Sequence, residues 1–154
     1  MEKQTIPLNY ANSLIYELEK AFWDERGRGA RFRLTTVGQG YYEENCKPIL
    51  RSRDLEQILQ TIGDLLQREG IVSEVSYNRE DRLLRMKVKG CLHQVVEEKM
   101  ISRGVEPFTC VPANLVALAI EEILDRPVEL AEVKVEDGAC HLLLVIFDHR
   151  PTLE

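Results

Sequence analysis

The chain has 154 residues, of which 44% are hydrophobic and 30% are charged, and its formal net charge is −6. These values are typical of one soluble globular domain that buries a core without disulfides. Acidic residues are dispersed and no basic stripe occurs, which argues against nucleic acid as a partner. Because no run of residues reads as a membrane span or a secretory signal, we expect a cytoplasmic protein whose four cysteines are reduced.

The first third of the chain predicts two helices. Residues 1–30 are expected to form an N-terminal arm and a helix, which should run from about residue 9 to residue 26. A second helix is predicted over residues 31–45 and would contain Gly38 and Gly40. Glycine inside a helix costs roughly 1 kcal/mol relative to alanine. Either the helix is broken there, or a backbone or ligand approaches a surface without side chains.

The clearest helix runs from Ser52 to Glu69. Ser52 is a suitable N-cap, an apolar stripe follows with helical spacing, and Gly70 stands where a C-terminal glycine belongs. The period then changes from 3.6 to 2. Strands over residues 71–77 and 84–89, joined by a turn at residues 78–81, predict a hairpin with one solvated face.

The last third predicts a buried helix followed by a second hairpin. The helix begins near Pro112 and has almost no polar face before residue 121. Two strands should follow on either side of a turn at residues 137–138, with a bulge between Leu130 and Val133. Residues 142–147 are continuously apolar, which predicts a central strand covered on both faces. Together the elements predict an α+β domain, with an antiparallel sheet of about four strands and helices packed on one side.

Several motifs occur in a characteristic order. A glycine pair (Gly38-Gln39-Gly40) precedes the capped helix, and Cys110-Val111-Pro112 opens the buried helix. Glu132-Val133-Lys134 and Gly138-Ala139-Cys140 then flank the last turn. Over residues 31–148 the chain resembles the vinyl-reductase domain family, also described as predicted hydrocarbon-binding proteins. That fold is shared with vesicle-tethering subunits of the Golgi transport complex. Residues 149–154 would be a polar tail.

The resemblance implies a homodimer that holds a small hydrophobic ligand between helices and sheet. It also implies a zinc site in some members, for which Cys110, Glu132 and Cys140 match three of the family's four ligands. The fourth position falls near Val135, which has no donor atom. Cys91, His93 and His141 are candidates for the missing ligand, and we take Cys91 to complete the set.

The residues themselves leave the role of the thiols open. Zinc binds about four thiolate, imidazole or carboxylate groups, which these side chains could supply. Free cysteines are also commonly buried as small apolar residues without a metal. Cys91 and His93 suggest a nucleophile pair, but two residues apart they seldom reach the geometry for attack and no orienting carboxylate is evident. We therefore predict no catalytic residue.

Aromatic side chains gather in the first two helices. We predict a ligand pocket lined by Phe32, Gly38, Gly40, Tyr41 and Tyr42, and the alternative is that these residues pack in the core or at a dimer interface. The predicted function is binding of a small hydrophobic molecule, or regulation by it, without catalysis. Two alternatives stay open: a protein–protein assembly subunit, and a tetrapyrrole-related reductase or metal-site protein.

Overall fold

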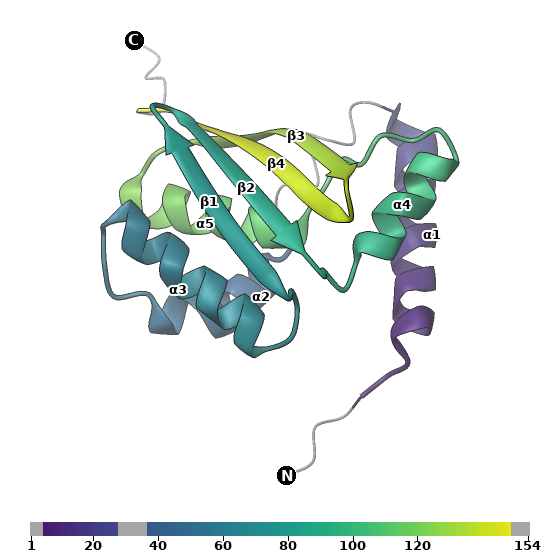
Figure 1. Ribbon diagram of the computed structural model, residues 1–154, viewed down its shortest axis with the longest axis horizontal. Coiled ribbons are helices and arrows are strands. Elements are labelled where there is room, and N and C mark those ends of the chain that lie inside the picture. Colours follow the sequence, from purple (N-terminus) through teal and green to yellow (C-terminus); the bar gives the residue numbers. More distant parts are fainter. Residues whose placement is uncertain (1–4, 28–36, 149–154) are drawn as a thin grey trace.

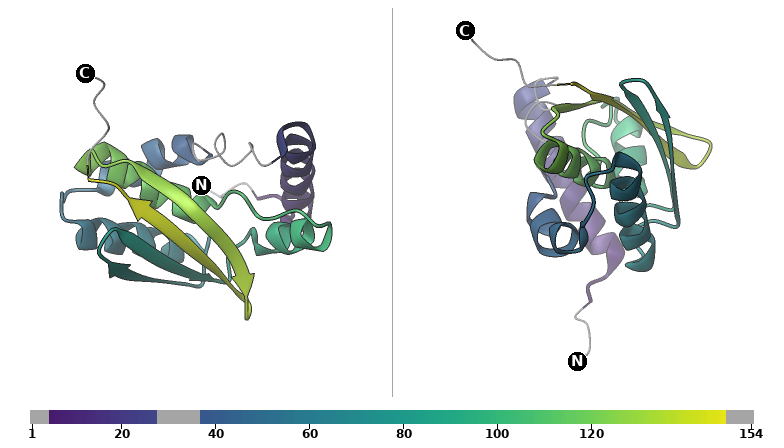
Figure 2. Two further views of the ribbon diagram at one scale, coloured as in Figure 1. Left: turned by 90° about the horizontal axis from the view of Figure 1, so that it is seen from above. Right: turned by 90° about the vertical axis from the view of Figure 1, so that its left-hand side faces the viewer.

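A four-stranded antiparallel sheet with the strand order β1-β2-β4-β3 forms one layer of the molecule (Figure 1). The computed structural model describes residues 5–27 and 37–148. Helices α3 and α5 lie together on one face of the sheet (Figure 2), so the predicted α+β architecture is confirmed. Within the described ranges, no helix is both long and apolar enough to cross a membrane. The elements are α1 (Leu8–Arg26), α2 (Gln39–Tyr41), η3 (Tyr42–Cys46), η4 (Lys47–Ile49), α3 (Leu55–Arg68), β1 (Glu74–Glu80), β2 (Leu83–Lys89), α4 (Gln94–Ser102), α5 (Val111–Leu124), β3 (Val128–Glu136) and β4 (Ala139–Ile146).

The main hydrophobic core lies between the sheet and helices α3 and α5. Alternate residues of β2 and β4 point toward the helices, because successive side chains of a strand lie on opposite faces. The apolar stripe of α3 meets them. Large side chains that are almost fully buried here include Ile58, Ile62, Leu66, Leu84, Met86, Leu115, Ile120 and Leu144.

A second, smaller cluster holds α1 against α4 beside one end of the sheet (Figure 1). Its centre is formed by Tyr16 from α1 and Met100 from α4, with Val105 and Phe108 from the segment that follows α4. The rings of Trp23 and Phe108 stack with their centroids 5.5 Å apart. The fold therefore has two apolar clusters.

The region of the predicted second helix differs from expectation. Residues 31–36 lie outside the described residues, and the helical structure that follows begins only at Gln39. Gly38 precedes it with φ = 105°, a backbone conformation that favours glycine. A Cβ at Gly38 would lie 3.3 Å from Cγ1 of Val111. The reading of Gly38 as an interior helix residue was wrong, because this glycine lets the chain turn closely against α5.

Two predicted boundaries also moved. Asp54, not Ser52, is the N-cap of α3, since its side chain accepts a hydrogen bond from the backbone N–H of Gln57 at 3.3 Å. Ser52 instead accepts one from the N–H of Asp54. The first hairpin turns at residues 81–82, three residues later than predicted, with Asp81 in the left-handed region at φ = 55°.

Strand β4 occupies the central position that its apolar sequence predicted, between β2 and β3. The bulge is also present, where the β3–β4 register shifts between Leu130 and Glu132. The prediction that both faces of β4 are buried was wrong. Leu143 and Val145 are only half-buried on the face away from α3 and α5. The outer face of the sheet is thus apolar along β4 although the two core helices cover only the inner face.

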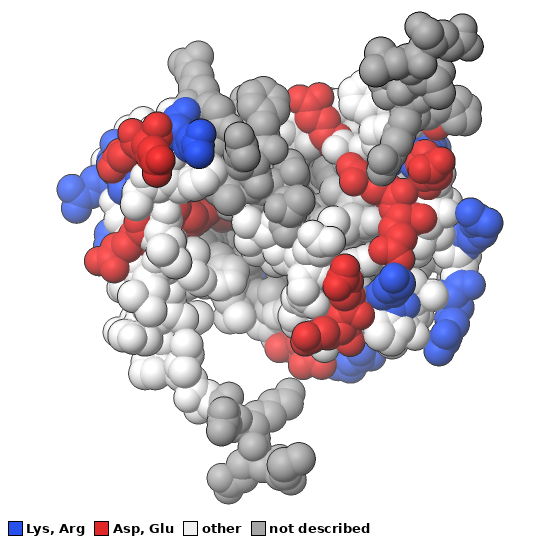
Figure 3. Space-filling model, turned by 180° about the vertical axis from the view of Figure 1, so that it is seen from behind, with Lys and Arg blue, Asp and Glu red and all other residues white. Residues whose placement is uncertain are grey.

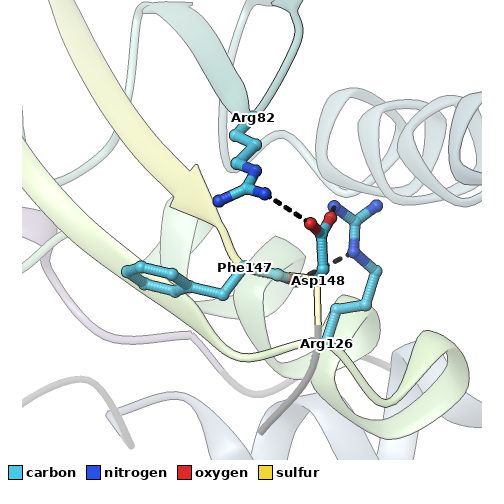
Figure 4. A network of polar contacts seen from close by, with 4 residues as sticks. All are labelled: Arg82, Arg126, Phe147 and Asp148. Carbon is cyan, nitrogen blue, oxygen red and sulfur yellow. Dashed lines mark hydrogen bonds and ion pairs between the residues drawn. The ribbon is translucent and has the colours of Figure 1, made fainter. Parts of the chain in front are cut away.

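A polar network closes the end of β4 (Figure 4). Asp148 accepts from Nη2 of Arg82 at 2.6 Å and from Nη2 of Arg126 at 3.2 Å. Arg126 also donates through Nε to the carbonyl oxygen of Phe147 at 2.9 Å. The network joins the β1–β2 turn, the turn before β3 and the end of β4. Because Asp148 and Arg82 are exposed, such pairs contribute little energy and mainly fix geometry.

Candidate ligand-binding cavity

A cavity of about 430 Å³ lies between α1, α4 and the N-terminal end of α5. Seen from behind, the surface between α1 and the body of the molecule is hollowed, and mostly uncharged side chains surround the hollow (Figure 3). The wall is mainly apolar, and its polar groups are few. The lining residues are Ile15, Leu18, Glu19, Phe22, Val37, Cys91, His93, Val96, Glu97, Thr109, Cys110, Val111 and Pro112.

Buried Asn12 fixes one wall of this cavity. Its Nδ2 donates to the carbonyl oxygen of Leu92 at 2.8 Å, and its Oδ1 lies 3.0 Å from Nδ1 of His93. The first bond fixes the orientation of the amide, so Oδ1 is the atom that faces His93 and it accepts. His93 therefore carries its proton on Nδ1, and burial lowers the pKa of its ring. A neutral ring leaves Nε2 as a hydrogen-bond acceptor.

A second buried amide, Asn114, fixes the opposite wall. It lies in the first turn of α5 and is 1% exposed. Its Nδ2 is 3.0 Å from the carbonyl oxygen of Val37 and 3.0 Å from Oγ1 of Thr109. Val37 and Thr109 both line the cavity, so one side chain sets the positions of two lining segments.

Two carboxyl groups, Glu19 from α1 and Glu97 from α4, face the same cavity. Burial, followed by the charge of Glu97, raises the pKa of Glu19 from 4.5 to about 7. Burial also raises the pKa of Glu97 to about 7, although a hydrogen bond from Cys140 opposes the shift. That bond runs from Sγ of Cys140 to Oε2 of Glu97 and is 3.1 Å long.

Three buried thiols surround Glu97. Burial raises the pKa of Cys91 to about 11, and it raises the pKa values of Cys110 and Cys140 further, with Glu97 adding to all three shifts. The thiols are therefore protonated near neutral pH. A protonated, buried thiol is a weak hydrogen-bond donor and a poor nucleophile.

The structure brings together three of the four predicted metal ligands but not the fourth. Cys91, Cys110 and Cys140 lie near Glu97, whereas Glu132 is exposed on the outer face of the sheet, in a groove shared with Lys134 and His141. The pleat places Glu132 and Cys140 on opposite faces. Among the described residues, no group of three or more His, Cys, Asp or Glu side chains is arranged to hold a metal. The predicted zinc set does not fit this geometry.

The predicted ligand-binding residues lie elsewhere. Phe32 is outside the described residues, and none of Gly38, Gly40, Tyr41 and Tyr42 is among the residues that line the cavity. Tyr42 is 1% exposed in the main core, and Tyr41 packs against that core. Tyr41 at the end of α2 and Tyr42 at the start of η3 therefore contribute to the main core and not to the cavity wall.

Comparison with known proteins gives a likeness to solved structures. No family model matches the chain, and no curated protein matches it either. A solved structure from work on haem distortion in the H-NOX family superposes with a TM-score of 0.51 and 14% sequence identity. The superposition covers 100% of this chain and 78% of that chain. At this identity the likeness shows the fold alone, an α+β fold, and the resemblance to the vinyl-reductase family stays a prediction.

Sequence reasoning missed four residues that build the cavity: Asn12, Glu19, Glu97 and Asn114. Each is a polar residue within a helix, and Asn114 has apolar residues on both sides. Of the adjacent residues Glu97 and Glu98, only Glu98 is exposed. An amide among apolar residues, as in Pro112-Ala113-Asn114-Leu115-Val116, is the signal that would have indicated a buried polar contact.

Proposed function

We propose that this protein binds a small hydrophobic ligand in the cavity between α1, α4 and α5, as a binding or regulatory module without chemistry of its own. The observation that carries the proposal is the cavity itself. Its volume of about 430 Å³ falls within the range of small-molecule sites, and its wall is apolar with a few convergent polar groups. The two buried amides hold that wall in place without a ligand.

The structural neighbour supports the proposal in a general way. Its description concerns haem distortion in the H-NOX family, which is compatible with an α+β fold of this kind holding a ligand. The proposal assigns no catalytic residue, since the thiols are protonated and His93 is bonded through Nδ1 to Asn12.

We further propose that the chain is a cytoplasmic homodimer whose subunits pack through α1. Tyr10, Leu14 and Leu18 recur every four residues and are 59%, 44% and 72% exposed. Residues with this spacing share one face of a helix, and an exposed apolar face favours a protein partner. The four free cysteines are compatible with a reducing compartment. Residues 1–30 would then be the dimerisation segment, residues 31–148 the ligand-binding domain and residues 149–154 a tail.

The ligand-binding proposal is tested with protein purified from its own source under native conditions. We expect native mass spectrometry to show a bound small molecule that is lost on unfolding. Calorimetric titration of emptied protein with 1-octanol should show saturable binding. Ile15→Trp places a larger side chain in the cavity wall and should weaken that binding at least about tenfold, or about 1.4 kcal/mol.

The matched control is Ile101→Trp on α4, where Ile101 is 45% exposed and does not line the cavity. It should leave octanol binding unchanged. If neither a co-purified molecule nor octanol binding is found in a folded protein, or if both variants have the same effect, the proposed function is wrong.

A further inference from the structure

The charged side chains described on the cavity wall are all acidic. Of the lining residues that the structure describes, only Glu19 and Glu97 carry a charged side chain. The other polar lining groups include His93, whose free Nε2 accepts hydrogen bonds, and the hydroxyl of Thr109. The apolar wall therefore carries strong acceptors and no cationic donor among the described residues.

Neither carboxyl group has a cation beside it among residues 5–27 and 37–148. In the part of the chain that the structure describes, no ion pair joins Glu19 or Glu97 to a lysine, arginine or histidine. Glu97 is 7% exposed, and its hydrogen-bond donor is the weak thiol of Cys140. A buried carboxylate without a cation is costly, so a group that supplies positive charge would bind here with a large gain.

The titratable groups that surround Glu97 on the neighbouring helices and strand are also acidic or neutral. Helix α1 contributes Glu19, strand β4 contributes Cys140, and α4 itself contributes Glu98. Cys91 and Cys110 complete the surroundings as neutral thiols. All of these groups are acidic or neutral, so the described protein offers no internal counter-ion.

We propose that the cavity selects ligands in which a protonated amine is attached to an apolar body, with the ammonium group paired to Glu19 and Glu97. This inference rests on the proposed function and adds the chemical class of the ligand. An ammonium has three N–H donors and no acceptor, which suits a wall of carboxylate and imidazole acceptors. A carboxylic acid or phosphate ligand would meet like charge in an apolar environment, where repulsion is strong.

Proton linkage makes the proposal measurable. Burial keeps the pKa values of both carboxyls near 7, so at lower pH the empty site holds protons that an ammonium must displace. Amine binding should therefore release protons near neutral pH and tighten as the pH rises through about 7. An alkylamine stays protonated over this range because its pKa lies near 10, as for lysine.

The test compares octylamine, 1-octanol and octanoate, which have the same chain length, by calorimetric titration of the full-length protein. At about pH 8 we expect octylamine to bind at least about tenfold more tightly than octanol, and octanoate to bind most weakly. At about pH 5.5 the advantage of the amine over octanol should shrink to less than about threefold.

Charge-neutralising variants test whether Glu19 and Glu97 cause the preference for octylamine over octanol. Glu19→Gln and Glu97→Gln should each reduce the advantage of octylamine over octanol, and the double variant should abolish it. The matched control is Glu98→Gln, an exposed neighbour on α4 that does not line the cavity, and it should preserve the advantage. If Glu97→Gln fails to fold, Glu19→Gln carries the test, because Glu19 is only half-buried.

The outcomes separate this inference from the proposed function. Equal affinities for amine and octanol at about pH 8, or a preference for octanoate, would overturn the amine inference and leave an apolar site in place. The same holds if Glu98→Gln removes the preference as fully as the two lining variants do. Absence of binding by all three compounds would overturn both proposals together.

Discussion

The thiol of Cys140 on β4 donates a hydrogen bond of 3.1 Å to Oε2 of Glu97 on α4. The two residues belong to different parts of the fold, since Cys140 lies in the main core and α4 packs with α1 in the second cluster. This contact links the sheet to the cavity wall. It also accounts for one oxygen of a buried carboxyl that has no cation beside it among the described residues.

The buried carboxyl should make stability depend on pH. The pKa of Glu97 is about 7 in the folded protein against 4.5 for an ordinary glutamate, so the folded state holds more protons between these values. The free energy of unfolding should therefore fall as the pH rises from about 4.5 to 7, by up to about 3 kcal/mol from this group.

The measurement is the difference between wild type and Glu97→Gln in urea unfolding across that range. His93 acts in the opposite direction, because its lowered pKa removes stability as the pH falls below about 6.5, but it is present in both proteins and cancels. We expect Glu97→Gln to gain stability relative to wild type as the pH rises. A difference that does not change with pH would contradict the assignment.

The four cysteines should resist modification in the folded protein. All four are free and buried, and burial raises the pKa values of Cys46 and Cys91 to about 11. Since the thiolate is the reactive form, a disulfide reagent at about pH 8 should modify less than about one thiol per chain rapidly. In denaturant the number of modified thiols per chain should reach four. Rapid reaction of more than one thiol in the native state would contradict the burial of these side chains.

Asn12 should contribute to stability through both of its hydrogen bonds. Replacing it with alanine leaves the carbonyl of Leu92 and Nδ1 of His93 without these partners, and should lower the free energy of unfolding by about 1–3 kcal/mol. The control is Asn45→Ala, which removes an exposed bond to the carbonyl of Tyr41 and should change stability by less than about 0.5 kcal/mol. Equal losses in the two variants would refute the role of Asn12 in holding α1.

The proposed dimer predicts a response to charge on α1. Light scattering should give twice the chain mass for wild type and the single-chain mass for Leu14→Glu, because a carboxylate at the subunit contact is costly to bury. Ile101→Glu is a suitable control, since Ile101 has nearly the same exposure, 45% against 44%, but lies on α4. A wild-type monomer, or loss of the dimer in both variants, would remove α1 as the interface.

Local patterns in the sequence predicted most of the elements. The stripe of α3, the cap glycine Gly70, the two hairpins and the bulge in β3 follow from side-chain period and turn chemistry, which act within a few residues. The errors were shifts at element ends, the burial predicted for both faces of β4, and the placement of Gly38 within a helix. The position of Gly38 depends on its close approach to Val111, which is 73 positions further along the chain. Such a contact leaves no signal in the local sequence.

The site was decided by tertiary structure. The sequence by itself determined that cysteines, carboxylates and apolar helices occur in this order. It did not determine that Glu97 would face Cys140, or that Asn12 and Asn114 would fix the cavity walls. Those contacts join residues 43 to 80 positions apart. Such contacts form only when α1 packs on α4 and α5 packs on the sheet, and a cavity is what this packing leaves unfilled.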